Sequence, residues 1–252
     1  SLLGDVRHLA FDLDDTLTWQ GTLPQVAANA LYLAHGHGLV CIVVTGRSFA
    51  WAQALMHLFP LRAAIAETGA VAILRDAQGR PDVVHSELRA QVREENAQRR
   101  RAVAEEVLRR FPFARLAADN VGRLYDTAFD LVEDGPSLTE SQTGQIETYL
   151  RRHGLKVCRS SVHINAWFGD FDKRSMLQTV LERLGEDPAR CFDSSLLYIG
   201  DSRNDGSLFE ATRLSVGVAN VAGCLADLRK NLQAPRYVAA QPGGFGFAEI
   251  VE

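Results

Sequence analysis

The sequence is poor in cysteine, and its four cysteines are far apart: Cys41, Cys158, Cys191 and Cys224. None of them belongs to a Cys-x-x-Cys pair, which argues against a zinc cluster. Scattered thiols in a chain of 252 residues favour a reducing compartment over a disulfide framework.

Long apolar runs and an excess of positive charge are also missing. No run approaches the roughly 20 residues that span a bilayer, and the first residues lack the basic start and apolar stretch of a signal peptide. The net charge of -4 does not favour nucleic acid or an anionic membrane as a partner. We therefore expect a soluble, cytoplasmic protein that acts on a small molecule.

The apolar pattern at both ends of the chain predicts an α/β fold. The run at 39–44, LVCIVV, is typical of a strand that is covered on both faces of a parallel sheet. Strands and helices alternate around it, which indicates crossover connections. The predicted strands are 6–13, 39–44, 63–67, 71–74, 195–200, 214–218 and 237–238, and the predicted helices are 25–36, 49–58, 173–185 and 205–213.

The middle of the chain has a different pattern. It predicts an α+β unit with a strand at 82–85, helices at 88–111 and 137–153, and further strands within 124–132 and 155–168. The simplest organisation is a discontinuous core domain, 1–78 and 166–252, with a second domain inserted at 79–165.

Arginines are concentrated on the helix predicted at 88–111, as Arg99-Arg100-Arg101 and Arg109-Arg110. They could form a patch for nucleic acid, or a solvated helix face. Glutamates lie four positions before Arg99, Arg109 and Arg110, the favourable order for ion pairs along a helix, so we favour the solvated face.

The densest polar cluster follows the first predicted strand and contains Asp12, Asp14, Asp15 and Thr16. Carboxylates this close repel one another, and a bound cation commonly offsets that repulsion. An oxygen-rich site suits a hard ion such as Mg²⁺. An acidic turn or a helix cap is the structural alternative.

Further polar groups stand at or just beyond other strand ends, where ligands collect in open α/β sheets. Thr45-Gly46-Arg47 follows LVCIVV and precedes a helix, so its hydroxyl and N–H groups can cradle a phosphate. Lys173 opens a helix, and a strand ends in Gly200-Asp201 before Asn204-Asp205. The structural alternatives are an ordinary turn, a surface charge and a helix cap.

Taken in this order, the clusters resemble the four motifs of the haloacid dehalogenase superfamily. These are the DxDxT of Asp12, Asp14 and Thr16, the strand-terminal Thr45, Lys173, and a GDxxND that holds Gly200, Asp201, Asn204 and Asp205. Thr45 follows Asp12 by 33 positions, but Lys173 follows Thr45 by 128. The insertion therefore falls between the second and third motifs. The resemblance implies a Rossmann-like parallel-sheet core with an inserted α+β cap of type C2B. This is class IIB, with the Cof-like, sucrose-phosphate and mannosylphosphoglycerate phosphatases.

The resemblance also implies a magnesium-dependent phosphatase and a role for each matched residue. Asp12 is the nucleophile, Asp14 the acid and base, and Thr45, Gly46, Arg47, Lys173 and Asn204 contact the phosphoryl group. Asp12, Asp14 through its carbonyl, and Asp201 bind Mg²⁺, with Asp205 beside them.

The resemblance leaves four alternatives to a phosphatase. A dehalogenase or a P-type-ATPase-like phosphotransferase lacks the acid at Asp14, and a sugar-phosphate mutase has another cap type. A catalytically silent binding protein has no support, because every core group is present. For the substrate we expect a small phosphorylated sugar or polyol, with Arg47 and the segment from His163 to Asn165 facing it.

Overall fold

The computed structural model describes residues 5–76, 78–87 and 89–252, and its main feature is an eight-stranded sheet with the order β11-β10-β9-β1-β2-β3-β4-β5. Neighbouring strands from β11 to β3 are parallel, whereas β4 and β5 are antiparallel. The strands are β1 (His8–Phe11), β2 (Val40–Val44), β3 (Ala63–Ala66), β4 (Val71–Arg75), β5 (Pro81–His85), β9 (Leu196–Gly200), β10 (Leu214–Gly217) and β11 (Tyr237–Val238).

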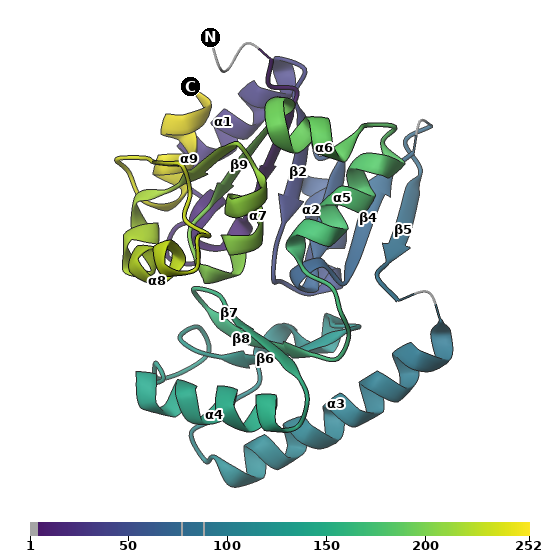
Figure 1. The fold of residues 1–252 in the computed structure, drawn as a ribbon, viewed down its shortest axis with the longest axis vertical. Coiled ribbons are helices and arrows are strands. Elements are labelled where there is room, and N and C mark those ends of the chain that lie inside the picture. Colours follow the sequence, from purple (N-terminus) through teal and green to yellow (C-terminus); the bar gives the residue numbers. More distant parts are fainter. Residues whose placement is uncertain (1–4, 77, 88) are drawn as a thin grey trace.

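Helices cover both faces of this sheet (Figure 1). One face packs against α1 (Gln25–Gly36), α2 (Phe49–Leu58) and α9 (Gly243–Val251), and the other against α5 (Lys173–Arg183), α7 (Gly206–Ala211) and α8 (Leu225–Lys230). In β1, Leu9 and Phe11 belong to the first core and Ala10 to the second. Burial on both faces explains why the central strands read as continuous apolar runs.

A separate lobe lies beyond one end of the sheet (Figure 1). It contains a three-stranded antiparallel sheet of β6 (Asp126–Asp130), β8 (His163–Trp167) and β7 (Lys156–Arg159). Helices α3 (Ala90–Arg110) and α4 (Glu140–Arg152) cover it. Its own core includes Val107, Phe129 and Ile146.

Side-chain caps fix where several helices begin. Thr139 and Gln142 form a reciprocal capping box at the start of α4, and Asp172 and Ser175 form another at the start of α5. The short α6 (Pro188–Arg190) begins at Asp187, whose carboxylate accepts two backbone N–H bonds. The cap at Asp172 matters for function, because it places Lys173 in the first turn of α5.

The predicted α/β sheet is confirmed, and α1 and α2 have the predicted bounds. The short strand predicted at 82–85 lies elsewhere than expected: β5 pairs with β4 in the large sheet, with Val83 opposite Ile73. Consecutive strands along a chain commonly pair with each other, which explains why β5 pairs with β4. The division into a core of 1–78 with 166–252 and an inserted domain of 79–165 stays a prediction. β5 falls within 79–165 but belongs to the large sheet.

The prediction of a solvated arginine face is wrong for Arg100. Its guanidinium is buried and donates to Thr127 Oγ1 and to the carbonyl oxygens of Leu124 and Tyr125. Arg99 is exposed and stacks over the Phe168 ring at 4.0 Å. Helix α3 therefore uses one arginine to hold the lobe together.

Three helices, α6, α8 and α9, were not predicted. All four cysteines are free thiols. Within the described ranges, no helix is both long and apolar enough to cross a lipid bilayer.

Candidate active site

Three of the expected residues follow the carboxyl ends of adjacent strands. β1 lies between β9 and β2, so Asp12, Asp201 and Thr45 follow neighbouring strands and converge at one edge of the sheet. All three are buried. The Asp12 N–H donates to Ile199 O at 2.9 Å, which continues the β1–β9 ladder up to the site.

Lys173 reaches this edge from the other side, at the start of α5. It is fully buried, and its Nζ lies 3.1 Å from Asp12 Oδ1, 2.6 Å from Asp205 Oδ1 and 3.2 Å from Asn204 Oδ1. Burial lowers the pKa of the Lys173 ammonium, but Asp12 and Asp205 outweigh it and raise that pKa above its ordinary value. Lys173 is therefore a fixed positive charge at the centre of the acidic cluster.

Asp205 is bound on both of its oxygens. Oδ1 accepts from Lys173 and from the Tyr198 hydroxyl at 2.5 Å, and Oδ2 accepts from the N–H groups of Asp201 and Ser202 at 3.0 Å each. These bonds hold the loop after β9 in place. Asp205 thus positions the Lys173 ammonium through Oδ1 and the backbone of Asp201 through Oδ2.

Asp201 is oriented by two neutral donors. The Thr16 hydroxyl donates to Oδ1 at 3.3 Å, and Asn220 Nδ2 donates to Oδ2 at 3.2 Å. Asn220 also donates to the carbonyl oxygen of Asp15 at 3.0 Å. The acidic loop after β1 and the loop after β9 are therefore joined.

The carboxylates fit a divalent cation. Oxygen atoms of Asp12, Asp201 and Asp205 lie within 4.8 Å of one another, and all three residues are buried. Among the described residues, Asp12 Oδ1 has no hydrogen-bond partner. Its contact with Lys173 Nζ is an ion pair. Burial raises the pKa of Asp12 to about 8, against Lys173 and with help from Asp205 and Asp14. Burial and the carboxylates of Asp205 and Asp12 raise the pKa of Asp201 well above its ordinary value. A hard cation with oxygen ligands would relieve this strain, so the donor set suits Mg²⁺.

Arg47 joins Asp14 to the lobe. Its Nε and Nη2 donate to both oxygens of Asp14 at 2.6–3.0 Å, and its Nη1 and Nη2 donate to Glu133 at 2.9 and 2.6 Å. His163 Nε2 lies 3.0 Å from Glu133 Oε2, the oxygen that also accepts from Arg47 Nη1. Burial raises the pKa of Glu133, but His163 and Arg47 outweigh it and hold that pKa at about 2. Glu133 is therefore a carboxylate facing the site.

The loop after β2 is also held by the lobe. Gly46 O accepts from Asn165 Nδ2 at 3.1 Å and from Arg123 Nη1 at 2.9 Å. A Cβ at Gly46 would lie in van der Waals contact with Asn165 Oδ1, at 3.4 Å, so the lobe packs directly against this turn. The Thr45 hydroxyl accepts from the Arg47 N–H at 3.0 Å, which shapes the turn.

Glu67 fastens the lobe to the large sheet. It follows β3, is fully buried, and has a left-handed φ of 49°. Its carboxylate accepts backbone N–H bonds from Phe49 on α2 and from Leu124, Tyr125 and Asp126 in the lobe, at 2.6–3.1 Å. One side chain thus ties the site's helix α2 to the start of β6.

Comparison with known proteins identifies the family. A family model described as sucrose-6F-phosphate phosphohydrolase matches residues 6–252. The chain belongs to the sucrose-6F-phosphate phosphohydrolase family. It is therefore a phosphatase of the haloacid dehalogenase superfamily, and the predicted class IIB is confirmed.

Solved structures agree on the fold of this sucrose-6F-phosphate phosphohydrolase family member. A protein of Thermoplasma acidophilum has a TM-score of 0.73 at 18% identity, over 97% of this chain and 96% of that one. The sucrose-phosphatase of Synechocystis, bound to sucrose and phosphate, has a TM-score of 0.68 at 18% identity, over 98% and 96%. A haloacid dehalogenase-like hydrolase of Bacteroides thetaiotaomicron has a TM-score of 0.67 at 16% identity, over 98% of both chains. No curated protein sequence matches the chain.

The structure places the residues named from the sequence around this edge of the large sheet, and beside them lie residues that were missed. Asn220 could have been found, because it is a polar residue shortly after the predicted strand 214–218. Tyr198 had a weaker local signal, since it lies within an apolar strand, and Glu67 stood out only as the last residue of the predicted strand 63–67. Glu133 had no local signal, because its partner Arg47 is 86 positions away in the sequence.

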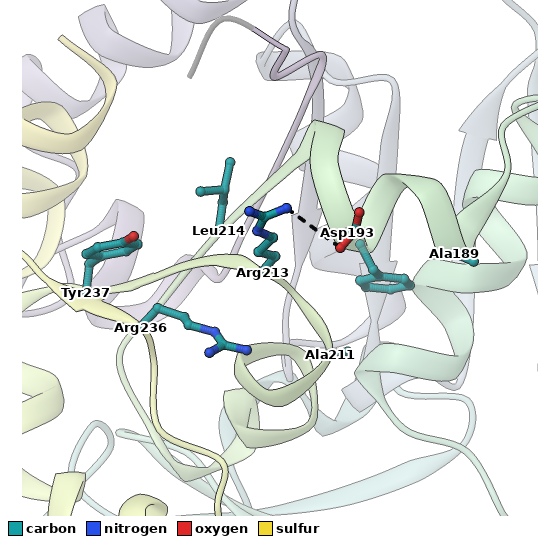
Figure 2. A pocket seen from close by; sticks show the side chains of 8 residues that line it. Ala189, Asp193, Ala211, Arg213, Leu214, Arg236 and Tyr237 are labelled. Atoms are coloured by element: carbon teal, nitrogen blue, oxygen red, sulfur yellow. Dashed lines mark ion pairs between the residues drawn. The ribbon is translucent and has the colours of Figure 1, made fainter. Parts of the chain in front are cut away.

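A separate hollow of about 480 Å³ lies away from the phosphatase site, where β10 begins (Figure 2). It is lined by Arg213, Arg236 and Tyr237 together with Asp193. Arg213 lies 3.9 Å from Asp193, and both side chains are exposed. None of the predicted site residues lines this hollow.

Proposed function

We propose that this phosphatase hydrolyses a small phosphorylated sugar or polyol with Mg²⁺, through a phospho-aspartyl intermediate on Asp12. The observation that carries the proposal is that Asp12 is buried beside Lys173, while Asp12 and Asp201 follow the ends of adjacent strands. Phosphoryl transfer requires a nucleophile in line and charge stabilisation around the phosphorus. These three side chains supply both.

In the first step the Asp12 carboxylate attacks phosphorus, the bond to the leaving oxygen breaks, and an aspartyl phosphate forms. Lys173, the Thr45 hydroxyl and the Gly46 N–H bind the phosphoryl oxygens. The Lys173 ammonium also lowers the pKa of Asp12 against the effect of burial, which favours the nucleophilic carboxylate.

Asp14 moves the proton in both steps. It gives a proton to the leaving oxygen, and then takes one from the water that attacks the aspartyl phosphate and releases inorganic phosphate. Arg47 contacts both oxygens of Asp14 and so fixes its orientation. A positioned acid and base contributes about 10²–10⁴-fold to such a reaction.

Asp12, Asp201 and the backbone carbonyl of Asp14 would hold Mg²⁺, with Asp205 supporting them. When bound, the ion would offset the negative charge of the nucleophile and of the phosphoryl group.

The proposed substrate class is supported by the lobe and by the family. The family description names sucrose-6F-phosphate, and the Synechocystis relative was solved with sucrose and phosphate. Glu133 accepts from Arg47, which also binds Asp14, and His163 lies beside Glu133, so the lobe brings both side chains next to the proposed acid. A carboxylate and an imidazole are good hydrogen-bonding partners for sugar hydroxyls.

A screen of phosphate release tests the proposal. It compares sucrose-6F-phosphate, other sugar and polyol phosphates, nucleotides and p-nitrophenyl phosphate, each with Mg²⁺ and with a chelator. We expect Mg²⁺-dependent release with the highest kcat/KM on a sugar or polyol phosphate. Preference for a nucleotide would contradict the substrate class, and isomerised sugar phosphate without phosphate release would indicate a mutase.

A further inference from the structure

A second group of side chains of metal-ligand type lies at the opposite end of β1 from Asp12. His8 opens β1, Cys191 follows α6 directly, and Glu186 lies in the loop between α5 and α6. One donor atom from each lies within 4.8 Å of the other two. His8 and Cys191 are buried, whereas Glu186 is exposed.

The contacts within this group are loose. His8 Nε2 lies 3.5 Å from Glu186 Oε1, and His8 Nδ1 lies 4.0 Å from Cys191 Sγ. Both distances exceed those of strong hydrogen bonds to nitrogen or oxygen. The group is thus not a tight ion pair. A neutral imidazole keeps a lone pair on one ring nitrogen, which can bind an ion.

The three donor types match one class of ion. Sulfur, imidazole nitrogen and carboxylate oxygen are the usual ligands of zinc, with bonds of about 2.0–2.3 Å. Tetrahedral geometry then keeps ligand atoms roughly 3.3–3.8 Å apart. Only one ring nitrogen can bind the ion, and the buried thiol already faces Nδ1. Glu186 must therefore move towards it, which its exposed position in a loop allows.

Charge balance and access also favour an ion here. A Cys191 thiolate and the Glu186 carboxylate together neutralise a divalent cation, so the occupied site would carry no net charge. A hollow of about 460 Å³ lined by Glu186 and Cys191 opens beside the group and leaves room for a water ligand. Its rim contains the acids Asp5 and Asp187 and the arginines Arg7 and Arg190. Their charges balance, so the rim does not repel a cation.

We propose that His8, Glu186 and Cys191 bind one zinc ion, with water as the fourth ligand, at a site separate from the phosphatase centre. Binding removes the thiol proton of Cys191, which passes to the solvent, and forms the sulfur–zinc bond. Because the ligands come from β1, a loop and the segment after α6, the ion would join three parts of the core. The folded protein would gain stability by mass action.

The experiment uses Co²⁺ and Zn²⁺ on the full chain, stripped with a chelator and kept in excess Mg²⁺ so that the carboxylates of the phosphatase centre are occupied. Co²⁺ bound to a thiolate gives a near-ultraviolet charge-transfer band, which a site of carboxylates alone cannot give. Zn²⁺ affinity is then measured by competition with a chromophoric chelator. The variants are Cys191→Ser and Glu186→Gln, and Cys41→Ser is the matched control because Cys41 is an equally buried thiol.

We expect a cobalt–thiolate band with one equivalent of metal in the wild type and in Cys41→Ser, and its loss in Cys191→Ser. Zn²⁺ affinity should fall more than about a hundredfold in Cys191→Ser, because changes outside the ligand shell already cost about 10–100-fold. Glu186→Gln changes an exposed side chain, so it should fold normally and lose at least about tenfold. The absence of the band in the wild type, or its persistence in Cys191→Ser, would overturn the proposal. Unchanged affinity in a folded Glu186→Gln would do the same for the role of Glu186.

Discussion

The Glu67→Gln change tests the buried carboxylate that fastens the lobe to the core. Gln can place its one amide oxygen where Oε2 lies, and so keep the bonds from Leu124, Tyr125 and Asp126. Its NH₂ group would then face the N–H groups of Phe49 and Leu124, which now donate to Oε1. The change removes a buried negative charge while it keeps the shape of the side chain.

The size of the effect follows from the pKa of Glu67. Burial, then Asp126, raise that pKa from 4.5 to about 7, against the backbone N–H groups and Arg123. Between these two pH values the folded state holds a proton that the unfolded state has lost, so stability falls as pH rises through this window. Each pKa unit is worth about 1.4 kcal/mol, so the wild type should lose about 3 kcal/mol that Glu67→Gln does not lose.

The assay is urea unfolding at pH 4.5 and at pH 8, with the wild type and the variant compared at each pH. The free-energy difference between the two proteins should shift by about 3 kcal/mol in favour of the variant at pH 8. Glu249→Gln is the control, because Glu249 also accepts two backbone N–H bonds but is exposed, and its shift should stay within about 0.5 kcal/mol. Equal shifts for Glu67→Gln and Glu249→Gln would refute the reasoning.

Further changes test the lobe, the packing around the site and the cation. Glu133→Gln should lower kcat/KM for the best sugar phosphate more than for p-nitrophenyl phosphate, and equal losses would argue against a contact with the leaving group. Gly69→Ala should lower the unfolding free energy by about 1–3 kcal/mol, because φ is 99° and a Cβ would lie 2.0 Å from Asp172 O. Gly144→Ala, in an open helical position, is its control in the same thermal melts and should not destabilise. Asp201→Asn should raise the Mg²⁺ concentration for half-maximal activity by at least about tenfold, and an unchanged requirement in a Mg²⁺ titration would contradict its role.

The centre of the site could be predicted because its signals are local. Asp12, Thr45 and Asp201 each follow an apolar strand, and parallel strands bring their carboxyl ends to one edge. Position along the chain therefore translates directly into position in space. Lys173 needed the family resemblance, since a single lysine before a helix has no such signal of its own.

Contacts between the lobe and the core could not be predicted in the same way. Arg47 and Glu133 are 86 positions apart, and nothing in either segment points to the other. Arg100 was misjudged for a related reason, because its neighbours on the helix are charged while its own position faces the lobe's sheet. Local charge patterns describe a helix in water and not the surface it packs against.

Helix α9 was missed because its composition opposes a helix. It contains Gly243, Gly244 and Gly246, and glycine has a low helix propensity. Close packing requires them: a Cβ at Gly244 would lie 2.5 Å from Leu17 O. Phe247 then packs edge-on against Phe11 at 5.1 Å, so tertiary contacts stabilise what local preference does not.

The most direct test of the account is to trap the intermediate on Asp12. Wild type and Asp12→Asn are mixed with substrate and Mg²⁺, quenched in acid within one turnover, and digested for peptide mass spectrometry. The account predicts one added phosphoryl group on the Asp12 peptide of the wild type, and in Asp12→Asn no such group and less than about 1% of the turnover. Full turnover in Asp12→Asn, or a phosphoryl group on another residue, would contradict it.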